Sequence, residues 1–540
     1  MEDFEKKPLA FSAVFSNHCV LQRERNISLF GTAEANKSLK LSLFNKNGQL
    51  LAENTGKADN SGHWLLQLSP QEAQEECKLV LTDEKTSIEL TDIAIGEVWL
   101  AGGQSNMEFE LQNCTEKEEL DDEKAGENVR FYYTNKNGWK DSAFYEQEKA
   151  SHWETWQSKE KGKWSAVGYF FAKNLSKELG VTVGVIGCNW GGTSASVWTD
   201  RAYMEKDSEL KIYLDEYDEA IKGKSIEEQC KEYDDYVVYH TAWDAKYQQM
   251  LKANPFTSWA EAEAKLGKCQ WPGPKSCKNP YRPSGLYECM VSRLTPYTIK
   301  GVIWYQGEND CHRPKVYNKL FSALIENWRD AFKNKELPFI FAQLPMHRYF
   351  NDKDAKEWAE LRQSQQKVFD SVKNTYMTNI LDQGAYNDIH PKAKATVASR
   401  MATIALSKVY NKTGLASHET GSACCACSDT LVKGDKMILT FKNVCEGLEY
   451  REDETRLQQY IEMEKVQGNA VAKDFTGAEI AGEDGVFYPA KIEIEGKDKI
   501  VLSSDKVSSP KSARYAWYNY GPVTLYTKSA LPVFPFNVEI

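Results

Sequence analysis

Ser105 stands in a turn that could expose a nucleophile. The segment GGQSNMEF (residues 102–109) directly follows the apolar run IAIGEVWLA, so a buried strand is expected to end in small and polar residues that can turn sharply. The hydroxyl of Ser105 is the one reactive group in that turn. A free serine hydroxyl is a weak nucleophile, so acyl-transfer chemistry also requires a base and donors for an oxyanion.

Three further segments carry residues of the types that this chemistry needs. They are GCNWGGTSASVWTD (187–200), WYQGENDCH (304–312) and YNDIHP (386–391). The first two follow strand-like runs, and the carboxyl ends of parallel strands are where α/β proteins place ligands. A serine, two turns rich in small residues or amides, and a carboxylate next to a histidine supply the parts of a serine-esterase site.

These segments resemble the SGNH (GDSL-type) hydrolases, specifically their sialate O-acetylesterase branch, which also holds plant-polysaccharide acetylesterases. The blocks GQSNM, WGGTSASVW, YQGEND and DIHPKAK occur in the order of that branch. The flanks VLQRERNISLFGTA and ARYAWYNYGPVTLYTKSALPVFPF are similar to its terminal β modules. The resemblance covers nearly the whole chain and implies a flavodoxin-like three-layer α/β/α core with a parallel sheet, flanked by N- and C-terminal all-β modules.

The resemblance implies roles for particular residues. Ser105 would be the nucleophile and His390 the general base. The oxyanion hole would consist of the backbone N–H groups of Ser105 and Gly192 and one side-chain amide. Asn309 matches the GxND block of the wider superfamily, whereas Gln306 is the glutamine that the acetylesterase branch keeps, and we prefer Gln306.

The position of the carboxylate expected to orient His390 departs from the family pattern. The superfamily spacing is Asp-x-x-His, but position 387 is Asn and the carboxylate is Asp388, two residues before His390. A shift of one residue turns a side chain of an extended segment to the other face. We predict Asp388 as the acid, with Asp382 and a backbone carbonyl as alternatives for orienting His390.

Four residues are candidates for binding substrate: Trp198, Trp304, Asn106 and Arg201. The tryptophans could be sugar platforms, and an arginine could clamp the carboxylate of sialic acid.

Glu308 and Asp310 are too close in sequence for an inverting glycosidase pair. We expect Glu308 to be buried and to hold its loop by hydrogen bonds.

The alternation of strand-like and helical patterns predicts a parallel sheet flanked by helices in the middle of the chain. Short alternating runs on either side predict β modules. The expected boundaries are an N-terminal β-sandwich at 1–93, a catalytic domain at 94–410 with a charged, aromatic-rich helical insertion at 201–285, and a C-terminal β module at 411–540.

The composition narrows the choice of partners. A net charge of −11 gives no electrostatic reason to expect nucleic acid or an anionic membrane, and no apolar run is long enough to span a membrane. The start of the chain lacks the pattern of a signal peptide, and the 13 irregularly spaced cysteines fit free thiols, so a cytoplasmic location is expected. CCAC (424–427) has no second ligand pair, and the chemistry requires no metal or cofactor.

The sequence therefore predicts a carbohydrate O-acetylesterase that acts by double displacement through an acetyl-enzyme. The expected partner is an acetylated mono- or oligosaccharide, either sialic acid or a xylo- or manno-oligosaccharide. The alternative is a non-catalytic carbohydrate-binding protein with a degenerate site, and Asn387 is the one feature in its favour.

Overall fold

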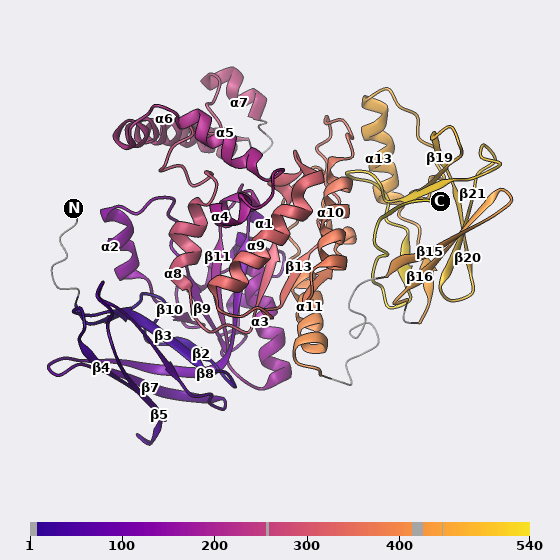
Figure 1. Cartoon of the computed structure of the whole chain (residues 1–540). Coiled ribbons are helices and arrows are strands. Elements are labelled where there is room, and N and C mark those ends of the chain that lie inside the picture. The colour runs from indigo at the N-terminus through magenta and orange to yellow at the C-terminus, as the bar shows by residue number, and fades with distance from the viewer. Residues whose placement is uncertain (1–7, 255–256, 258, 413–424, 445) are drawn as a thin grey trace. The chain divides into compact units, whose positions relative to one another are not determined.

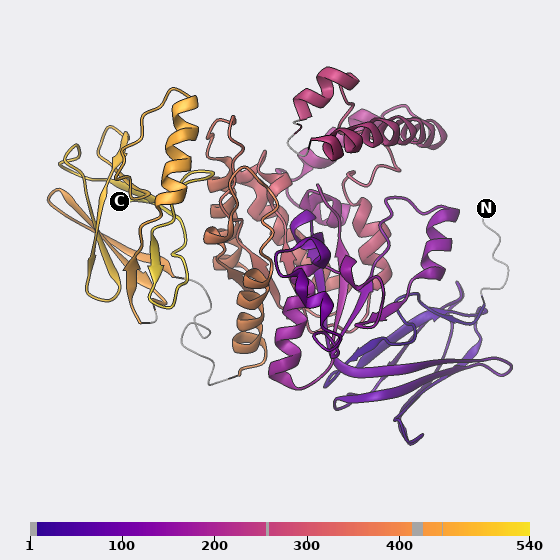
Figure 2. The ribbon, with the colours of Figure 1, turned by 180° about the vertical axis from the view of Figure 1, so that it is seen from behind.

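The computed structural model describes residues 8–254, 257, 259–412, 425–444 and 446–540. The chain divides into two compact units. Unit 1 comprises Met1–Thr134, Ser151–Ala195 and Leu294–Ile540, and unit 2 comprises Asn135–Ala150 and Ser196–Arg293. Figure 1 shows the elements of both units along the chain, and Figure 2 shows the same ribbon from behind.

Strand β8 (Ser87–Gly103) is the longest strand of unit 1 and belongs to two sheets. Its first half pairs antiparallel with β7 (Gln74–Thr82), and residues 94–96 pair with β2 (Val20–Gln22). Its second half lies between the parallel strands β11 (Val183–Asn189) and β12 (Gly301–Tyr305). Burial changes along β8 from partial to complete at Ile93, as expected where a one-sided sheet becomes a sheet covered on both faces. The boundary expected between residues 93 and 94 falls inside this strand.

The central sheet runs in the order β10-β9-β11-β8-β12-β13-β14. The strands not yet given are β9 (Val129–Tyr133), β10 (Trp153–Thr155), β13 (Phe339–Ala342) and β14 (Thr375–Thr378). All are parallel except the edge strand β10. Strands β9 to β11 lie on one side of β8 and strands β12 to β14 on the other, so the chain crosses over at β8 and its carboxyl end is a topological switch point, where α/β sheets open a crevice for ligands.

Helices pack on both faces of this sheet. Trp99 of β8 packs against Phe171 of α3 (Ala166–Leu179), whereas the space beside Gly102, three residues on, is filled by Trp328 of α9 (Tyr317–Ala331). Residues three apart on a strand point to opposite faces. Helix α3 contacts α11 (Ala395–Ile404), and α9 contacts α10 (Glu357–Ser371).

The N-terminal part of unit 1 contains two sheets. Strands β1 (Ala10–Phe11), β3 (Ile27–Thr32) and β6 (His63–Leu68) form the first. Strands β4 (Ser38–Phe44) and β5 (Leu50–Lys57) join β7 and β8 in the second. Burial alternates along β6, the pattern of a strand with one face in a core.

The C-terminal part of unit 1 is also mainly β. Its sheets are β15-β16-β21-β20, β19-β18-β22-β24 and the pair β17-β23. The bounds are β15 (Ala426–Lys433), β16 (Lys436–Lys442), β17 (Leu448–Tyr450), β18 (Ala478–Ala481), β19 (Phe487–Pro489), β20 (Lys491–Glu495), β21 (Lys499–Ser503), β22 (Ser512–Tyr515), β23 (Leu525–Thr527), β24 (Phe536–Glu539) and helix α13 (Glu454–Val466).

Buried polar contacts join this region to the α/β core. The Trp358 backbone N–H of α10 donates to Asn519 Oδ1 at 3.0 Å, and the buried Arg362 of α10 donates to the carbonyl of Tyr518.

Unit 2 is helical. Its helices include α2 (Ser142–Ala150), α4 (Arg201–Met204), α5 (Lys211–Ile221), α6 (Ile226–Ala253) and α7 (Trp259–Leu266). Ser225 and Glu228 form a capping box at the start of α6, which satisfies the first free N–H groups of this long helix. Among the described residues, no helix is long and apolar enough to cross a membrane.

Candidate active site

The turn after β8 brings Ser105 against His390. Gly103 has a φ of +138°, and a Cβ there would lie 2.2 Å from the carbonyl oxygen of Tyr305, so this position requires glycine. Helix α1 (Ser105–Glu108) begins directly after the turn. Ser105 Oγ lies 2.8 Å from His390 Nε2, within hydrogen-bonding distance. The pair has the geometry of a nucleophile and its general base.

Gln104 fixes this turn to the loop after β12. Its backbone N–H donates to the Tyr305 carbonyl at 3.1 Å. Its side-chain Oε1 accepts from the backbone N–H groups of Gly307 at 3.4 Å and Asn309 at 3.2 Å. The first and third blocks are therefore one hydrogen-bonded assembly.

Asn106 joins three segments through its buried amide. Its Nδ2 donates to Glu308 Oε1 at 2.6 Å and to the Ile389 carbonyl at 3.0 Å. Its Oδ1 accepts from Lys394 Nζ at 2.6 Å. The prediction that Asn106 binds substrate is therefore not supported, because the side chain is fully buried and its hydrogen bonds are internal.

The charges around Asn106 are also buried. Burial raises the pKa of the Glu308 carboxyl, and within the described residues Glu308 Oε2 has no hydrogen-bond partner. Burial lowers the pKa of the Lys394 ammonium to about 7. The ammonium lies 4.8 Å from the ring centroid of Phe109 and 5.5 Å from that of Tyr305, distances typical of cation–π contacts.

These surroundings favour the neutral form of His390. Burial lowers the pKa of its imidazole, and the nearby Lys394 lowers it further, while Asp388 and Glu108 oppose the shift. A neutral imidazole can accept the proton of a serine hydroxyl, so the electrostatics suit a base.

The contact of Asp388 differs from the predicted one. Its Oδ1 accepts from the backbone N–H of His390 at 2.9 Å, not from the imidazole. Within the part of the chain that is described, the Nδ1 of His390 has no hydrogen-bond partner. Asn387, at the position of the superfamily acid, has a φ of +56°, and its Oδ1 accepts from the Phe350 N–H at 2.9 Å. Among the described residues, neither side chain therefore has a hydrogen bond to the ring.

Asp382, the rival acid, is also engaged elsewhere. Its two oxygens accept from Arg400 at 2.7 and 2.8 Å in a bidentate ion pair. The structure therefore does not bring Asp382 to His390.

The second block lies against the nucleophile. The N–H of Gly191 donates to Glu108 Oε2 at 2.5 Å, and a Cβ on Gly191 would lie 3.3 Å from the Cβ of Ser105. Gly192 has a φ of +70°, and its carbonyl accepts from Asn309 Nδ2 at 2.7 Å. In the described ranges, the backbone N–H groups of Ser105 and Gly192 have no acceptor. They are available to an oxyanion beside Ser105.

Gln306, the preferred oxyanion amide, is instead part of the protein interior. Its Nε2 donates to the Thr193 carbonyl at 3.0 Å and to Asp310 Oδ2 at 2.7 Å. Its Oε1 accepts from Tyr317 Oη at 2.9 Å. Both amide hydrogens have acceptors and the side chain has no exposed surface, so the geometry favours the exposed Asn309.

Asp310 links the second block to the third by hydrogen bonds. It is fully buried and accepts from Ser194 Oγ at 2.6 Å and from the Ala195 N–H at 2.8 Å. Burial raises the pKa of its carboxyl. Asp310 and Glu308 both have internal donors, as expected of carboxylates that hold loops.

The remaining candidates for substrate binding are engaged or buried. Trp304 has no exposed surface and stacks on Phe321, with ring centroids 5.8 Å apart. Trp198, in unit 2, also has no exposed surface. Arg201 pairs with Glu205 at 2.8 Å and with Asp218 at 3.0 Å. The predictions of two sugar platforms and an arginine clamp are therefore not supported.

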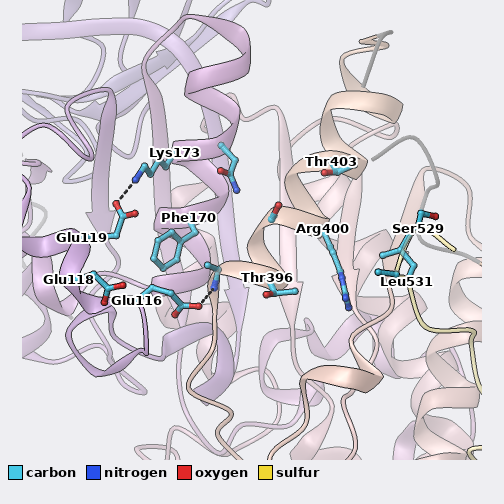
Figure 3. A pocket seen from close by; sticks show the side chains of 14 residues that line it. Glu116, Glu118, Glu119, Phe170, Lys173, Thr396, Arg400, Thr403, Ser529 and Leu531 are labelled. Carbon is cyan, nitrogen blue, oxygen red and sulfur yellow. Dashed lines mark hydrogen bonds and ion pairs between the residues drawn. The ribbon is translucent and has the colours of Figure 1, made fainter. Parts of the chain in front are cut away.

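A separate cavity of about 640 Å³ lies between α3, α11 and residues 529–531 (Figure 3). Lys173 pairs with Glu119, and Glu116 accepts from backbone N–H groups at the start of α11. Arg400, on its wall, is held by the bidentate pair described above. These charges have partners within the protein, so we assign the cavity no ligand.

In the described ranges, no group of three or more His, Cys, Asp or Glu side chains is arranged to hold a metal ion. Cys424 of the CCAC segment lies outside those ranges.

Sequence reasoning missed the roles of Gln104, Glu108 and Lys394. All three lie inside or beside the quoted blocks, and Lys394 is four residues after His390. Their positions within the blocks could have indicated a role in the site. Their residue types are normally found at the surface, however, and they make these contacts because they are buried.

Comparison with known proteins relates the chain to carbohydrate esterases. Residues 268–407 match the family described as "carbohydrate esterase, sialic acid-specific acetylesterase". The sialate O-acetylesterase of Rattus norvegicus is 25% identical over 573 aligned positions, which cover 98% of this chain and 94% of that protein. The sialate O-acetylesterase of Homo sapiens is also 25% identical, over 75% of this chain and 72% of its own length.

A solved structure is similar over nearly the whole chain. The crystal structure of a carbohydrate acetylesterase from Xanthomonas citri is 25% identical and superposes with a TM-score of 0.71. The alignment covers 98% of this chain and 99% of that one.

We predict that Lys394→Met moves the acidic limb of the kcat/KM–pH profile to higher pH. Below about pH 7 the Lys394 ammonium is charged and disfavours the imidazolium of His390, so removing it raises the pKa of the base. The measurement is hydrolysis of 4-nitrophenyl acetate between pH 4 and 9, where the acidic limb reports the free base. Lys392→Met, at an exposed lysine of the same segment, is the control and should leave the limb in place. An unmoved limb in Lys394→Met would contradict the electrostatic role.

We predict that Asp388→Asn retains ester hydrolysis to within about tenfold of the wild-type kcat/KM, because the Asn Oδ1 can still accept the His390 backbone N–H, at a cost near that of one hydrogen bond. In a serine protease, replacing the acid of the triad with its amide lowers kcat about 10⁴-fold. A loss of that size here would show that Asp388 orients the imidazole. Ser105 acylation rates under single-turnover conditions provide the measurement.

Proposed function

We propose that the chain, an esterase similar to the sialic acid-specific acetylesterases among the carbohydrate esterases, hydrolyses acetyl esters on sugar hydroxyl groups through an acetyl-Ser105 intermediate. The observation that carries the proposal is the 2.8 Å contact between Ser105 Oγ and His390 Nε2. The backbone N–H of Gly192 adds support, because it has no acceptor among the described residues and the preceding residue, Gly191, lies against Ser105.

In the first half of the reaction, Ser105 Oγ attacks the acetyl carbonyl carbon while His390 Nε2 accepts the hydroxyl proton. The resulting oxyanion accepts hydrogen bonds from the backbone N–H groups of Ser105 and Gly192 and from Asn309 Nδ2. The C–O bond to the sugar then breaks, and the imidazolium of His390 returns its proton to the leaving sugar oxygen.

In the second half, a water molecule attacks the acetyl-enzyme. His390 accepts a proton from this water, and the same three donors bind the second oxyanion. Collapse of this intermediate breaks the bond to Ser105 Oγ, which recovers its proton from His390. The products are the free sugar hydroxyl and acetate.

The base functions in this scheme as part of a dyad. Because Asp388 binds the backbone of His390, its carboxylate holds the loop in position without accepting from the ring. Burial and the Lys394 charge lower the pKa of the imidazole, which favours its neutral form. The support for this arrangement is the internal network of Asn106, which ties the loop of His390 to the turn of Ser105.

We also propose that the α/β core is a three-layer α/β/α sandwich. Helices α3 and α9 pack on opposite faces of the central sheet, which supports this arrangement. The switch point at the end of β8 then places the nucleophile where this class of fold puts its ligands.

The substrate that we favour is an uncharged acetylated oligosaccharide. A sialic acid carboxylate requires a cationic partner, and Arg201, the predicted clamp, is already held by Asp218 and Glu205. Acetylated xylo- and manno-oligosaccharides need no such partner.

We predict that the wild-type protein releases acetate from acetylated xylo- or manno-oligosaccharides more efficiently than from O-acetylated sialic acid. Ser105→Ala should abolish this release, because the nucleophile is lost, while its melting temperature stays at the wild-type value. Enzymatic detection of acetate across the three substrates is the measurement. If folded wild-type protein releases acetate from none of them, the site is degenerate and the protein is a binding protein.

We predict opposite consequences for the two amides of the third block. Asn309→Ala should lower kcat about 10²- to 10³-fold, the usual cost of one oxyanion donor, and leave stability unchanged. Gln306→Ala should instead lower the free energy of unfolding by about 1–3 kcal/mol, because it leaves buried partners unsatisfied. Steady-state kinetics and urea unfolding of both variants provide the test. The reverse pattern would assign the oxyanion role to Gln306.

A further inference from the structure

Unit 2 contains a cavity with an aromatic wall. It has a volume of about 1080 Å³ and lies between α6 and the loop that follows α7. Its volume is at the upper end of the range of ligand sites in proteins. The residues of its lining used below are Tyr236, Tyr239, Lys268, Gln270, Trp271 and Gly273.

The indole of Trp271 is an exposed apolar surface at this cavity. About half of the residue (51%) is accessible, although tryptophan is usually among the more buried side chains. Its ring is held in place by His240 and Tyr281, with ring centroids 5.4 and 5.5 Å away. A flat aromatic face held by neighbours loses little conformational entropy when a ligand stacks on it.

Tyr236 contributes a buried polar atom without a partner. The residue is 9% exposed, and in the described residues its Oη has no hydrogen-bond partner. Gly273 permits this packing, because a Cβ there would lie 2.4 Å from the Tyr236 ring. A buried hydroxyl without a partner is costly, so it indicates a site that a ligand or water completes.

The wall also carries polar groups in fixed positions. Tyr239 Oη donates to the Lys268 carbonyl at 3.1 Å and accepts from the Gln270 N–H at 3.3 Å, which fixes the loop. Glu232 and Asp235 line the cavity and are paired with Lys224 and Lys231, each at 2.6 Å. Both carboxylates therefore have cationic partners within the protein.

We propose that this cavity is a binding site for an uncharged oligosaccharide, distinct in its residues from the esterase site. A pyranose ring has an apolar C–H face that suits Trp271, and its hydroxyl groups suit Tyr236 Oη and the Gln270 amide. The choice of a carbohydrate over another polar ligand rests on the proposed function.

The test uses Ser105→Ala protein and oligosaccharides without acetyl groups, so that binding is measured independently of esterase chemistry. Isothermal titration calorimetry with xylohexaose and mannohexaose should give binding of a neutral chain in the millimolar range or tighter. Trp271→Ala should weaken binding about tenfold or more, the change expected when an aromatic contact is lost.

Tyr236→Phe is the second variant. Because the Tyr236 hydroxyl has no protein partner, its removal should leave the melting temperature unchanged or higher while weakening oligosaccharide binding. Trp259→Ala is the matched control, since Trp259 is a half-exposed tryptophan of unit 2 that contacts Trp243 and Tyr247 and does not line the cavity.

The binding measurements on these variants either support or overturn the proposed oligosaccharide site. Wild-type binding in folded Trp271→Ala and Tyr236→Phe, or no binding of either neutral chain, would overturn the proposal. Acetate release by the protein with an intact Ser105 would still support the proposed function in that case. Selective loss of binding in both variants, with Trp259→Ala unaffected, would establish the site.

Discussion

The candidate site depends on the buried amide of Asn106, which links three of its segments by hydrogen bonds. It is adjacent to the nucleophile, and its three hydrogen bonds reach the loop after β12, the segment that carries His390, and the start of α11. A buried carboxylate and a buried ammonium are each costly without polar partners. The amide supplies a donor to Glu308 and an acceptor to Lys394, so both charges can lie beneath the reactive pair, and the electrostatics of His390 follow from this arrangement.

Several similar contacts make four distant segments into one rigid structure. Gln104, Glu108 and Asp310 each bind a backbone N–H of another block, and each is a side chain of a type that could equally have faced water. Positions of reacting atoms must be held closely for acyl transfer, and surface loops alone do not hold them. These polar side chains therefore form the interior of the loop assembly. In the sheet, apolar side chains have that role.

The residues proposed to perform the chemistry could be identified from the sequence because they stand in blocks that resemble those of a known family. Ser105 and His390 stand at the positions that the resemblance gives to nucleophile and base, and the structure places them in contact. Gln306 and Asn309 carry the same functional group, so only burial distinguishes them, and burial is a property of the folded chain. Trp198 and Trp304 were misassigned for the same reason. The alternation of strands and helices in the core could be predicted from the sequence. The continuity of β8 could not be predicted, because a strand that passes from one sheet to another has no turn residues at that point.

That continuity limits how such a chain can be assembled in evolution. Domain shuffling requires a junction across which few contacts pass, and such junctions usually lie in linkers. Strand β8 has none near residues 93 and 94, because β7 pairs with residues on both sides of that point, β2 pairs directly after it at residues 94–96, and β11 and β12 pair with the residues that follow. A recombination event there would sever the strand that ends in the nucleophile. The N-terminal β region and the catalytic core are therefore inherited together as one genetic unit.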